Sequence, residues 1–154
     1  MTRILIIEDD TILSRLVVNW LEEAGMKPEC VTSIREGFTR LKKFDYDLIL
    51  SDLRLPDGSG IKILDWINEN RKQTPFIIMT KYGDVPTAVD AVKRGAVEFI
   101  EKPVHDIPLL EAIQKALDER AKNGGDTKII KRVSKAYQQL VEKAELVAGY
   151  DLSV

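Results

Sequence analysis

The stretch Leu48-Ile49-Leu50-Ser51-Asp52 decides the fold that we expect for this chain. Three apolar residues lead to a serine and a lone carboxylate, and residues 53–60, which contain Pro, Asp and Gly, then turn the chain sharply. A short continuous apolar run of this kind indicates a strand that is covered on both faces. Asp52 would then lie at the end of such a strand, which makes it the first candidate for a reactive side chain.

Four other apolar runs recur along the chain. They cover residues 4–7, 29–32, 76–79 and 97–100, and longer amphipathic stretches separate them. Alternation of buried strands with helices indicates a parallel sheet built by right-handed crossovers. The sequence therefore predicts an α/β fold with a doubly wound, five-stranded parallel sheet.

Five helices are expected to follow these runs. The first extends from about Asp10 to Gly25, and the second from Ser33 to about Lys43, with Ser33 as its N-cap and Glu36 as the partner in a capping box. The other three begin near residues 60, 84 and 106. The apolar stripe of the first helix consists of Ile12, Leu13, Leu16, Val17, Trp20 and Leu21.

The stretch Asn123-Gly124-Gly125-Asp126 interrupts this pattern. We divide the chain there into a first domain of residues 1–122, a linker of residues 123–132 and a further helix within residues 133–154. Apolar residues at helical spacing between residues 133 and 147 support the last assignment.

Composition excludes several classes of protein. The net charge of −2 gives no overall attraction to nucleic acid or to an anionic membrane. No apolar run approaches the roughly 18 residues of a membrane span, so we expect no membrane partner. The single cysteine, Cys30, allows no internal disulfide, which is consistent with a cytoplasmic location.

In a doubly wound sheet, ligands bind outside the carboxyl ends of the strands. Four of the five runs place a chemically useful residue at this edge. These residues are Glu8, Asp9 and Asp10 after the first run, Asp52 after the third, Thr80 after the fourth and Lys102 after the fifth.

This mixture of groups predicts phosphoryl transfer. The carboxylates of Glu8, Asp9 and Asp52 would repel one another, and a hard cation such as Mg²⁺ removes that conflict. Asp52 can then attack a phosphodonor as a nucleophile, while Lys102 and Thr80 meet phosphoryl oxygens. No strong general base is evident, so the acyl phosphate should persist, as a signal requires.

Four motifs in order carry a resemblance to a known family. They are residues 5–10 (Leu-Ile-Ile-Glu-Asp-Asp), residues 47–60 (Asp-Leu-Ile-Leu-Ser-Asp-Leu-Arg-Leu-Pro-Asp-Gly-Ser-Gly), residues 77–80 (Ile-Ile-Met-Thr) and residues 95–103 (Gly-Ala-Val-Glu-Phe-Ile-Glu-Lys-Pro). With them, residues 3 to about 121 resemble the receiver domains of two-component response regulators. The resemblance implies the flavodoxin-like strand order 2-1-3-4-5.

The resemblance also implies a role for each site residue. Asp52 is the phosphoacceptor, and the protein ligands of Mg²⁺ are Asp9, Asp52 and the backbone carbonyl of Arg54, with Glu8 acting through water. We prefer Glu8 and Asp9 to Asp9 and Asp10 as the acidic pair, because Glu8 directly follows the apolar run.

The remaining implied roles concern the switch. Thr80 is the switch hydroxyl, Phe99 the switch aromatic residue and Lys102 the phosphate-binding lysine, and a cis peptide precedes Pro103. The residue after the switch hydroxyl is usually small in this family, whereas here it is Lys81. A long cation at this position puts the rates of phosphorylation and hydrolysis in question.

The family resemblance predicts the partners. A sensor histidine kinase donates the phosphoryl group, and phosphorylation reshapes the face made by the fourth helix, fifth strand and fifth helix. Residues 133–154 look like the opening of the ATPase domain of a sigma-54-dependent transcription activator of the nitrogen-regulatory type. The chain lacks the Gly-rich phosphate loop of that domain, so we interpret it as a fragment that ends just before the loop.

On this interpretation, sigma-54 RNA polymerase and DNA are partners only through domains that are absent from this chain. The protein itself is a phosphoacceptor, which takes part in its own phosphorylation and slow dephosphorylation, and not an enzyme with turnover. Two alternatives stay open. One is a complete, stand-alone receiver-like module whose last helix forms a homodimer. The other is an aspartate-based phosphatase of the haloacid dehalogenase kind, which would need a second acid where Arg54 stands.

Overall fold

The computed structural model describes residues 1–70, 72–81 and 84–122. In chain order the elements are β1 (Arg3–Ile7), α1 (Thr11–Glu23), β2 (Lys27–Val31), α2 (Ile34–Lys43), β3 (Leu48–Asp52), β4 (Arg54–Leu55), β5 (Gly58–Ser59), α3 (Ile61–Glu69), β6 (Phe76–Thr80), α4 (Val85–Lys93), β7 (Glu98–Glu101) and α5 (Asp106–Lys122). The predicted linker and the predicted helix of residues 123–154 lie outside the described residues. Within the described ranges, no helix combines the length and the hydrophobicity needed to cross a bilayer.

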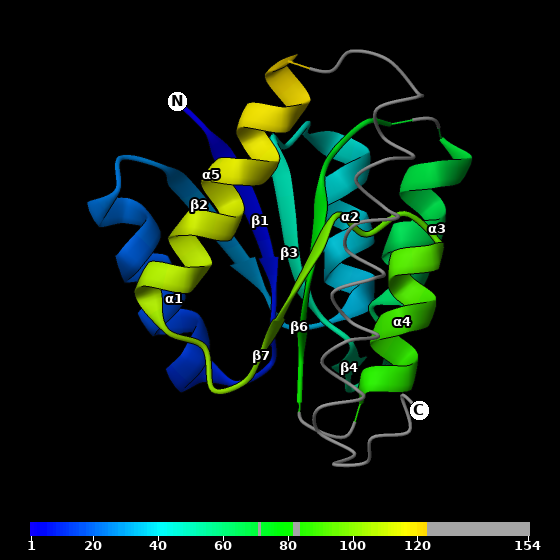
Figure 1. The fold of residues 1–154 in the computed structure, drawn as a ribbon. Coiled ribbons are helices and arrows are strands. Elements are labelled where there is room, and N and C mark those ends of the chain that lie inside the picture. Colours follow the sequence, from blue (N-terminus) through cyan, green and yellow to red (C-terminus); the bar gives the residue numbers. More distant parts are fainter. Residues whose placement is uncertain (71, 82–83, 123–154) are drawn as a thin grey trace, which may run out of the picture.

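The five long strands form a parallel sheet in the order β2-β1-β3-β6-β7. This is the predicted order 2-1-3-4-5, because β6 and β7 are the fourth and fifth long strands, and the prediction of a doubly wound sheet is confirmed. Helices α1 and α5 cover one face of the sheet, and α2, α3 and α4 cover the other (Figure 1). The strand ends that follow β1, β3, β6 and β7 therefore meet at one edge, which we call the carboxyl edge.

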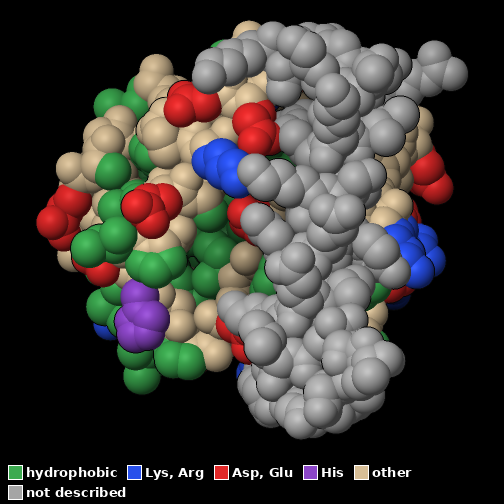
Figure 2. Space-filling model, in the orientation of Figure 1, with side chains coloured by type: hydrophobic (Ala, Val, Ile, Leu, Met, Phe, Trp, Pro, Cys, Tyr) green, Lys and Arg blue, Asp and Glu red, His purple; other side chains and the backbone are tan. Residues whose placement is uncertain are grey.

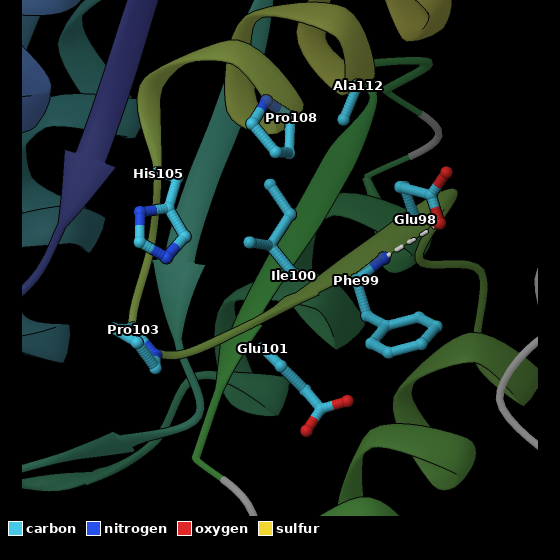
Figure 3. A pocket seen from close by; sticks show the side chains of 8 residues that line it. All are labelled: Glu98, Phe99, Ile100, Glu101, Pro103, His105, Pro108 and Ala112. Atoms are coloured by element: carbon cyan, nitrogen blue, oxygen red, sulfur yellow. Dashed lines mark hydrogen bonds between the residues drawn. The ribbon is translucent and has the colours of Figure 1, made fainter. Parts of the chain in front are cut away.

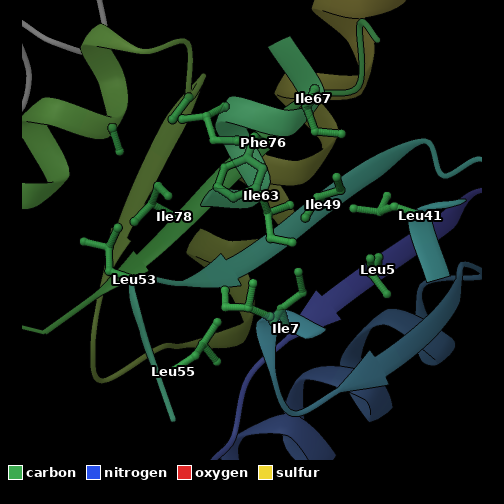
Figure 4. Close-up of a cluster of buried hydrophobic side chains, with 14 of the residues drawn as sticks. Leu5, Ile7, Leu41, Ile49, Leu53, Leu55, Ile63, Ile67, Phe76 and Ile78 are labelled. Carbon is green, nitrogen blue, oxygen red and sulfur yellow. The ribbon is translucent and has the colours of Figure 1, made fainter. Parts of the chain in front are cut away.

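The central strands contribute side chains to two hydrophobic cores, one on each face of the sheet. In β1, Leu5 and Ile7 pack into the cluster under α2, α3 and α4, whereas Ile4 and Ile6 pack into the cluster under α1 and α5. The first cluster also receives Phe76 and neighbouring apolar side chains of β3 and α3 (Figure 4). Since alternate residues of a strand point to opposite faces, double burial explains why the strands read as continuous apolar runs.

Helices α1 and α2 begin close to their predicted starts, and Ser33 is the N-cap of α2 as predicted, but the contact of Glu36 differs from the prediction. Asp10 accepts hydrogen bonds from the backbone N–H groups of Ile12 and Leu13 at 2.9 and 3.1 Å, and Ser33 accepts one from Glu36 at 3.2 Å. The carboxylate of Glu36, however, accepts from the N–H of Thr32 at 2.8 Å. The predicted capping box is therefore displaced by one residue, because Glu36 reaches the residue before the N-cap.

The predicted apolar stripe of α1 is only partly buried. Val17 and Leu21 are fully buried, but Ile12 is 74% exposed and Leu16 is 46% exposed. Ser14 lies on the buried side instead. The stripe prediction was wrong for Ile12 and Leu16, because helical spacing alone did not locate the centre of the face that meets the sheet.

The segment after Asp52 contains a small antiparallel ribbon that the sequence did not predict. Strands β4 and β5 pair Arg54 with Ser59 and Leu55 with Gly58. At the turn between them, the carboxylate of Asp57 accepts hydrogen bonds from the N–H groups of Ile34 and Arg35 at 2.8 and 3.0 Å. These bonds hold the pKa of Asp57 below its usual range, and they fasten the ribbon to the first turn of α2.

Gly60 ends the ribbon at a very close approach to the phosphoacceptor candidate. A Cβ atom at this position would lie 2.2 Å from the backbone oxygen of Asp52 and 2.7 Å from the Oγ of Ser51. Its φ angle of −59° is ordinary for any residue, so space rather than conformation requires glycine here. Gly25 shows the opposite case, with a φ of +83° and nothing within 4 Å of its Cβ position.

We expect Gly60→Ala to destabilise the domain by about 2–3 kcal/mol, because backbone atoms of the buried strand β3 cannot give way. Gly25→Ala serves as a matched control and should cost only about 1 kcal/mol through backbone strain. Urea unfolding followed by tryptophan fluorescence measures both. Equal losses in the two variants would contradict the close-approach argument.

Candidate functional site

The carboxyl edge brings together the residues that were predicted to meet there. Asp52 and Thr80 are the last residues of β3 and β6, Glu8 directly follows β1, and Lys102 directly follows β7. Glu8, Asp52 and Thr80 are all buried, with 1%, 4% and 0% of their surfaces exposed. Strands β3 and β6 therefore extend beyond their apolar runs and include Asp52 and Thr80, whereas Glu8 and Lys102 are the first residues after β1 and β7.

Lys102 joins two of these strand ends. Its Nζ lies 2.8 Å from Oε1 of Glu8 and 2.8 Å from Oδ2 of Asp52. The Lys102 side chain is only 15% exposed, so the three charges interact in a poorly solvated environment, where electrostatic interactions are stronger than in water. One ammonium thus balances two carboxylates, and the site keeps an excess of negative charge.

The pKa values of Glu8 and Lys102 are both raised from their usual values, which agrees with the excess of negative charge. Burial raises the pKa of Glu8, although the hydrogen bond from Lys102 acts in the opposite direction. Burial by itself would lower the pKa of Lys102, but its hydrogen bonds to Asp52 and Glu8 outweigh that effect and raise it. A further positive charge at this site would act on Glu8 in the same direction as Lys102 and favour its carboxylate form.

Asp9 adds a third carboxylate to the site. Oxygen atoms of Glu8, Asp9 and Asp52 lie within 4.8 Å of one another, and Asp9 is exposed to solvent. Asp10 has a different position, because its carboxylate caps α1 and its own N–H donates to Oε2 of Glu8 at 3.1 Å. This geometry favours Glu8 and Asp9 as the acidic pair, and the donor set of three carboxylates fits a hard divalent cation.

The two switch candidates lie on the neighbouring strands. The hydroxyl of Thr80 donates to the backbone oxygen of Lys81 at 3.2 Å, while the Lys81 side chain is exposed. Phe99 is half-buried at the edge of the cluster under α4. The peptide bond between Lys102 and Pro103 is cis, as predicted.

Phe99 also lines a surface pocket between β7 and the start of α5. The pocket contains Glu98, Glu101 and His105 with apolar residues between them (Figure 3). His105 is exposed and directly precedes α5, as expected for a residue at a helix start, and Figure 2 shows its side chain in purple beside a group of hydrophobic side chains. This face therefore combines apolar and acidic groups, which a protein partner can contact.

Arg54 makes contacts that sequence reasoning missed. Its backbone N–H donates to Oδ1 of Asp52 at 3.3 Å, and its Nε lies 2.9 and 3.0 Å from the two carboxylate oxygens of Asp84. These residues are 30 positions apart, and no short motif links them. Only the meeting of the two strand ends in space reveals the contact.

The family assignment follows from comparison with known proteins. The sequence profile described as "Response regulator receiver domain" matches residues 4–114. The chain belongs to this family. The matched residues include Glu8, Asp9, Asp52, Thr80 and Lys102 at the carboxyl edge.

Curated relatives of this receiver domain are bacterial regulators. The chain is 36% identical to the acid tolerance regulatory protein ActR of Rhizobium meliloti, over 76% of this chain and 60% of ActR. It is 33% identical to the transcriptional regulatory protein GlrR of Escherichia coli, over 98% of this chain and 34% of GlrR. The matched part thus spans less than two thirds of ActR and about one third of GlrR.

Solved structures agree with the fold. The beryllofluoride-activated NtrC4 receiver domain dimer superimposes with a TM-score of 0.73 at 35% identity, covering 77% of this chain and 98% of that one. A CheY-like receiver from Methanospirillum hungatei gives a TM-score of 0.75 at 33% identity, over 79% of this chain and 98% of that chain. These likenesses place the described residues within the receiver fold throughout.

We expect Lys102→Met to destabilise the receiver domain by about 3 kcal/mol, because it leaves two buried carboxylates without their shared cation. Adding Glu8→Gln to this variant should restore part of the loss, since one of the two charges is then removed. Thermal unfolding in the absence of divalent cations measures both effects.

Lys72→Met is the matched control for this lysine substitution. Its ammonium pairs with the exposed Asp45 at 3.1 Å, so its loss should cost less than about 1 kcal/mol. If Lys102→Met is as mild as Lys72→Met, then the ion pairs at the carboxyl edge do not contribute as described.

Proposed function

We propose that Asp52 accepts a phosphoryl group from a sensor histidine kinase and that Mg²⁺ assists the transfer. The observation that carries this proposal is the meeting of Glu8, Asp9 and Asp52 within 4.8 Å beside a single lysine. Asp9, Asp52 and the backbone carbonyl of Arg54 would hold the ion, with Glu8 acting through water. Bound Mg²⁺ would neutralise carboxylate charge and stabilise the charge on the phosphoryl oxygens.

The chain's own groups account for the rest of the transfer. Lys102 holds Oδ2 of Asp52 at 2.8 Å, which orients the carboxylate for in-line attack on phosphorus. The new bond joins an Asp52 oxygen to phosphorus while the phosphorus–nitrogen bond of the donor histidine breaks. Lys102 can then turn from the carboxylate to a phosphoryl oxygen, where its charge stabilises the product.

The switch would start at Thr80. Its hydroxyl donates to the Lys81 carbonyl in the present structure, and a phosphoryl group offers a more strongly charged acceptor. Rotation of Thr80 toward Asp52 would free space for the half-buried Phe99. Because Phe99 lines the pocket between β7 and α5, its movement would reshape the face formed by α4, β7 and α5.

Two exposed isoleucines suit the carboxyl edge to a kinase. Ile12 lies in the first turn of α1, which follows Glu8 and Asp9, and Ile107 lies in the first turn of α5, which follows Lys102. They are 74% and 65% exposed. We propose that the phosphohistidine-bearing domain of the kinase covers these apolar side chains while it presents its phosphoryl group to Asp52.

The output is proposed to be control of transcription through a downstream domain. The alignment with GlrR covers 98% of the chain, so it includes the stretch beyond Lys122 as well as the receiver. This supports the division into residues 1–122, 123–132 and 133–154 and the start of a sigma-54-type ATPase domain at its end. A cytoplasmic location would follow from this role.

Mg²⁺ and acetyl phosphate should add one phosphoryl group to the protein, as intact mass spectrometry would show. Asp52→Asn should abolish the adduct. Asp10→Asn is the matched control, because asparagine caps a helix as well as aspartate does, and it should be phosphorylated like the wild type. An adduct on Asp52→Asn, or none on the wild type, would overturn the proposal.

Phosphorylation should also change self-association if the α4–β7–α5 face is the switch. Beryllofluoride with Mg²⁺ is expected to shift the wild-type protein from monomer toward dimer in light scattering, and Asp52→Asn should not respond. The NtrC4 receiver, which is a beryllofluoride-activated dimer, motivates this experiment. A dimer of unchanged mass in both states would instead favour the stand-alone dimerisation module.

A further inference from the structure

Arg54 and Asp84 form an ion pair beside Asp52, which we call the bridge. Besides the two contacts of Nε, an Nη of Arg54 lies 2.8 Å from Oδ1 of Asp84. The bridge joins β4, which follows β3, to the N-cap of α4, and the backbone N–H of Arg54 also donates to Oδ1 of Asp52 at 3.3 Å. Arg54 therefore contacts the phosphoacceptor with its backbone and the switch helix with its side chain.

The two partners differ in their surroundings. The Arg54 side chain is 69% exposed, whereas that of Asp84 is only 13% exposed. The hydrogen bond from Arg54 lowers the pKa of Asp84, and the charges of Arg54, Lys81 and Lys102 act in the same direction. Asp84 is thus a sheltered anion near the cations of the site, whereas most of the surface of the Arg54 side chain that pairs with it is exposed to solvent.

Asp84 also stands at a position where its side chain normally has a second role, which is to cap a helix. It occupies the N-cap position of α4, yet its side chain makes no capping hydrogen bond. The first turn of α4 contains no acidic residue, and Pro86 lacks an N–H. An aspartate at this position normally accepts a hydrogen bond from the second or third residue of the helix. Here its carboxylate pairs with Arg54 instead, and its backbone, with φ −98° and ψ 16°, lacks the extended conformation of the N-caps Asp10 and Ser33.

A phosphoryl group on Asp52 would compete for the guanidinium. It carries about 1.5 to 2 negative charges and three strong acceptor oxygens, whereas Asp84 offers one charge. Arginine binds such an oxygen pair with two parallel N–H groups. The hydrogen bond to Asp84 is the main cause of the raised pKa of Arg54, and the charge of Asp52 acts in the same direction.

We propose that the Arg54 guanidinium is a second cationic contact for the phosphoryl group, held by Asp84 until phosphorylation, and that the released Asp84 then caps α4. This inference rests on the proposed phosphorylation of Asp52. Asp84 acts as a positioning residue, since it sets both where Arg54 is stored and when the first turn of α4 is stabilised. The exchange links the chemistry of β3 directly to the switch face through one pair of side chains.

The test measures the affinity for beryllofluoride, in the presence of Mg²⁺, for four variants of the full chain. Arg54→Gln should weaken binding about two- to fivefold, the range of an exposed ion pair. Asp84→Asn should strengthen it by a similar factor, because asparagine releases Arg54 and still caps α4. Asp84→Ala should gain less, since alanine cannot cap, and Asp84→Asn should gain nothing in the Arg54→Gln background.

Arg94→Gln is the matched control for loss of an exposed arginine. Arg94 also binds an aspartate with two contacts, at 3.1 and 3.0 Å to Asp65, and it also joins α4 to another element, but far from Asp52 along the chain. It should leave beryllofluoride affinity unchanged. In the wild type, the ¹⁵N side-chain resonance of Arg54 Nε, assigned by its loss in Arg54→Gln, should shift on addition of beryllofluoride while that of Arg94 does not.

The outcomes separate this inference from the proposed function. If the wild type binds beryllofluoride but Arg54→Gln binds equally well, or if Asp84→Asn gains equally without Arg54, the exchange is wrong and the phosphoacceptor role stands. An unmoved Arg54 resonance in the bound wild type would also overturn it, with no dependence on how a variant folds. If the wild type binds no beryllofluoride and takes no phosphoryl group, both proposals fail.

Discussion

The ammonium of Lys102, held between Glu8 and Asp52 at 2.8 Å from each, is the interaction on which the site depends. It ties the carboxyl ends of β1, β3 and β7 together across the sheet. A buried charge is costly unless it is paired, so the two acids depend on a lysine that lies 50 positions after Asp52 in the sequence. The parallel order of the sheet is what brings these three strand ends to one edge.

The same interaction leaves the site incompletely neutralised. One ammonium faces two buried carboxylates, and Asp9 adds a third from the solvent side. This imbalance costs the unliganded domain some stability, and it creates the attraction for a cation that phosphoryl transfer needs. The arrangement thus exchanges stability for function in a way that is common where perturbed ionisable groups gather.

The sheet and the residues at its carboxyl edge were largely predictable from the sequence, because buried parallel strands appear in it as continuous apolar runs. The apolar runs located β1, β3, β6 and β7, and the polar residues at their ends identified Glu8, Asp52, Thr80 and Lys102. Contacts between residues of opposite charge on separate loops produce no such pattern. The cap that Asp57 provides for α2 and the pairing of Arg54 with Asp84 depend on distances that only the folded chain defines.

Partial burial was the other source of error. Ile12 and Leu16 have the same helical spacing as Val17 and Leu21, yet they face solvent. An apolar residue on a helix satisfies the periodicity rule whether it meets the sheet or borders the interface, so spacing cannot distinguish a core position from a surface that awaits a partner. The exposed isoleucine beside the acidic site is informative for that reason.

The burial of the strands differs across the sheet, and this difference has a mechanical consequence. Every residue of β3, which carries Asp52, is buried, whereas Ile100 is the one buried residue of β7, which leads to Lys102. Asp52 therefore stands on a strand that is packed on both faces, whereas Lys102 follows a partly covered strand at the edge of the sheet. We expect a charge added at Asp52 to displace β7 more than β3, because a segment with fewer buried contacts moves at a smaller cost in free energy.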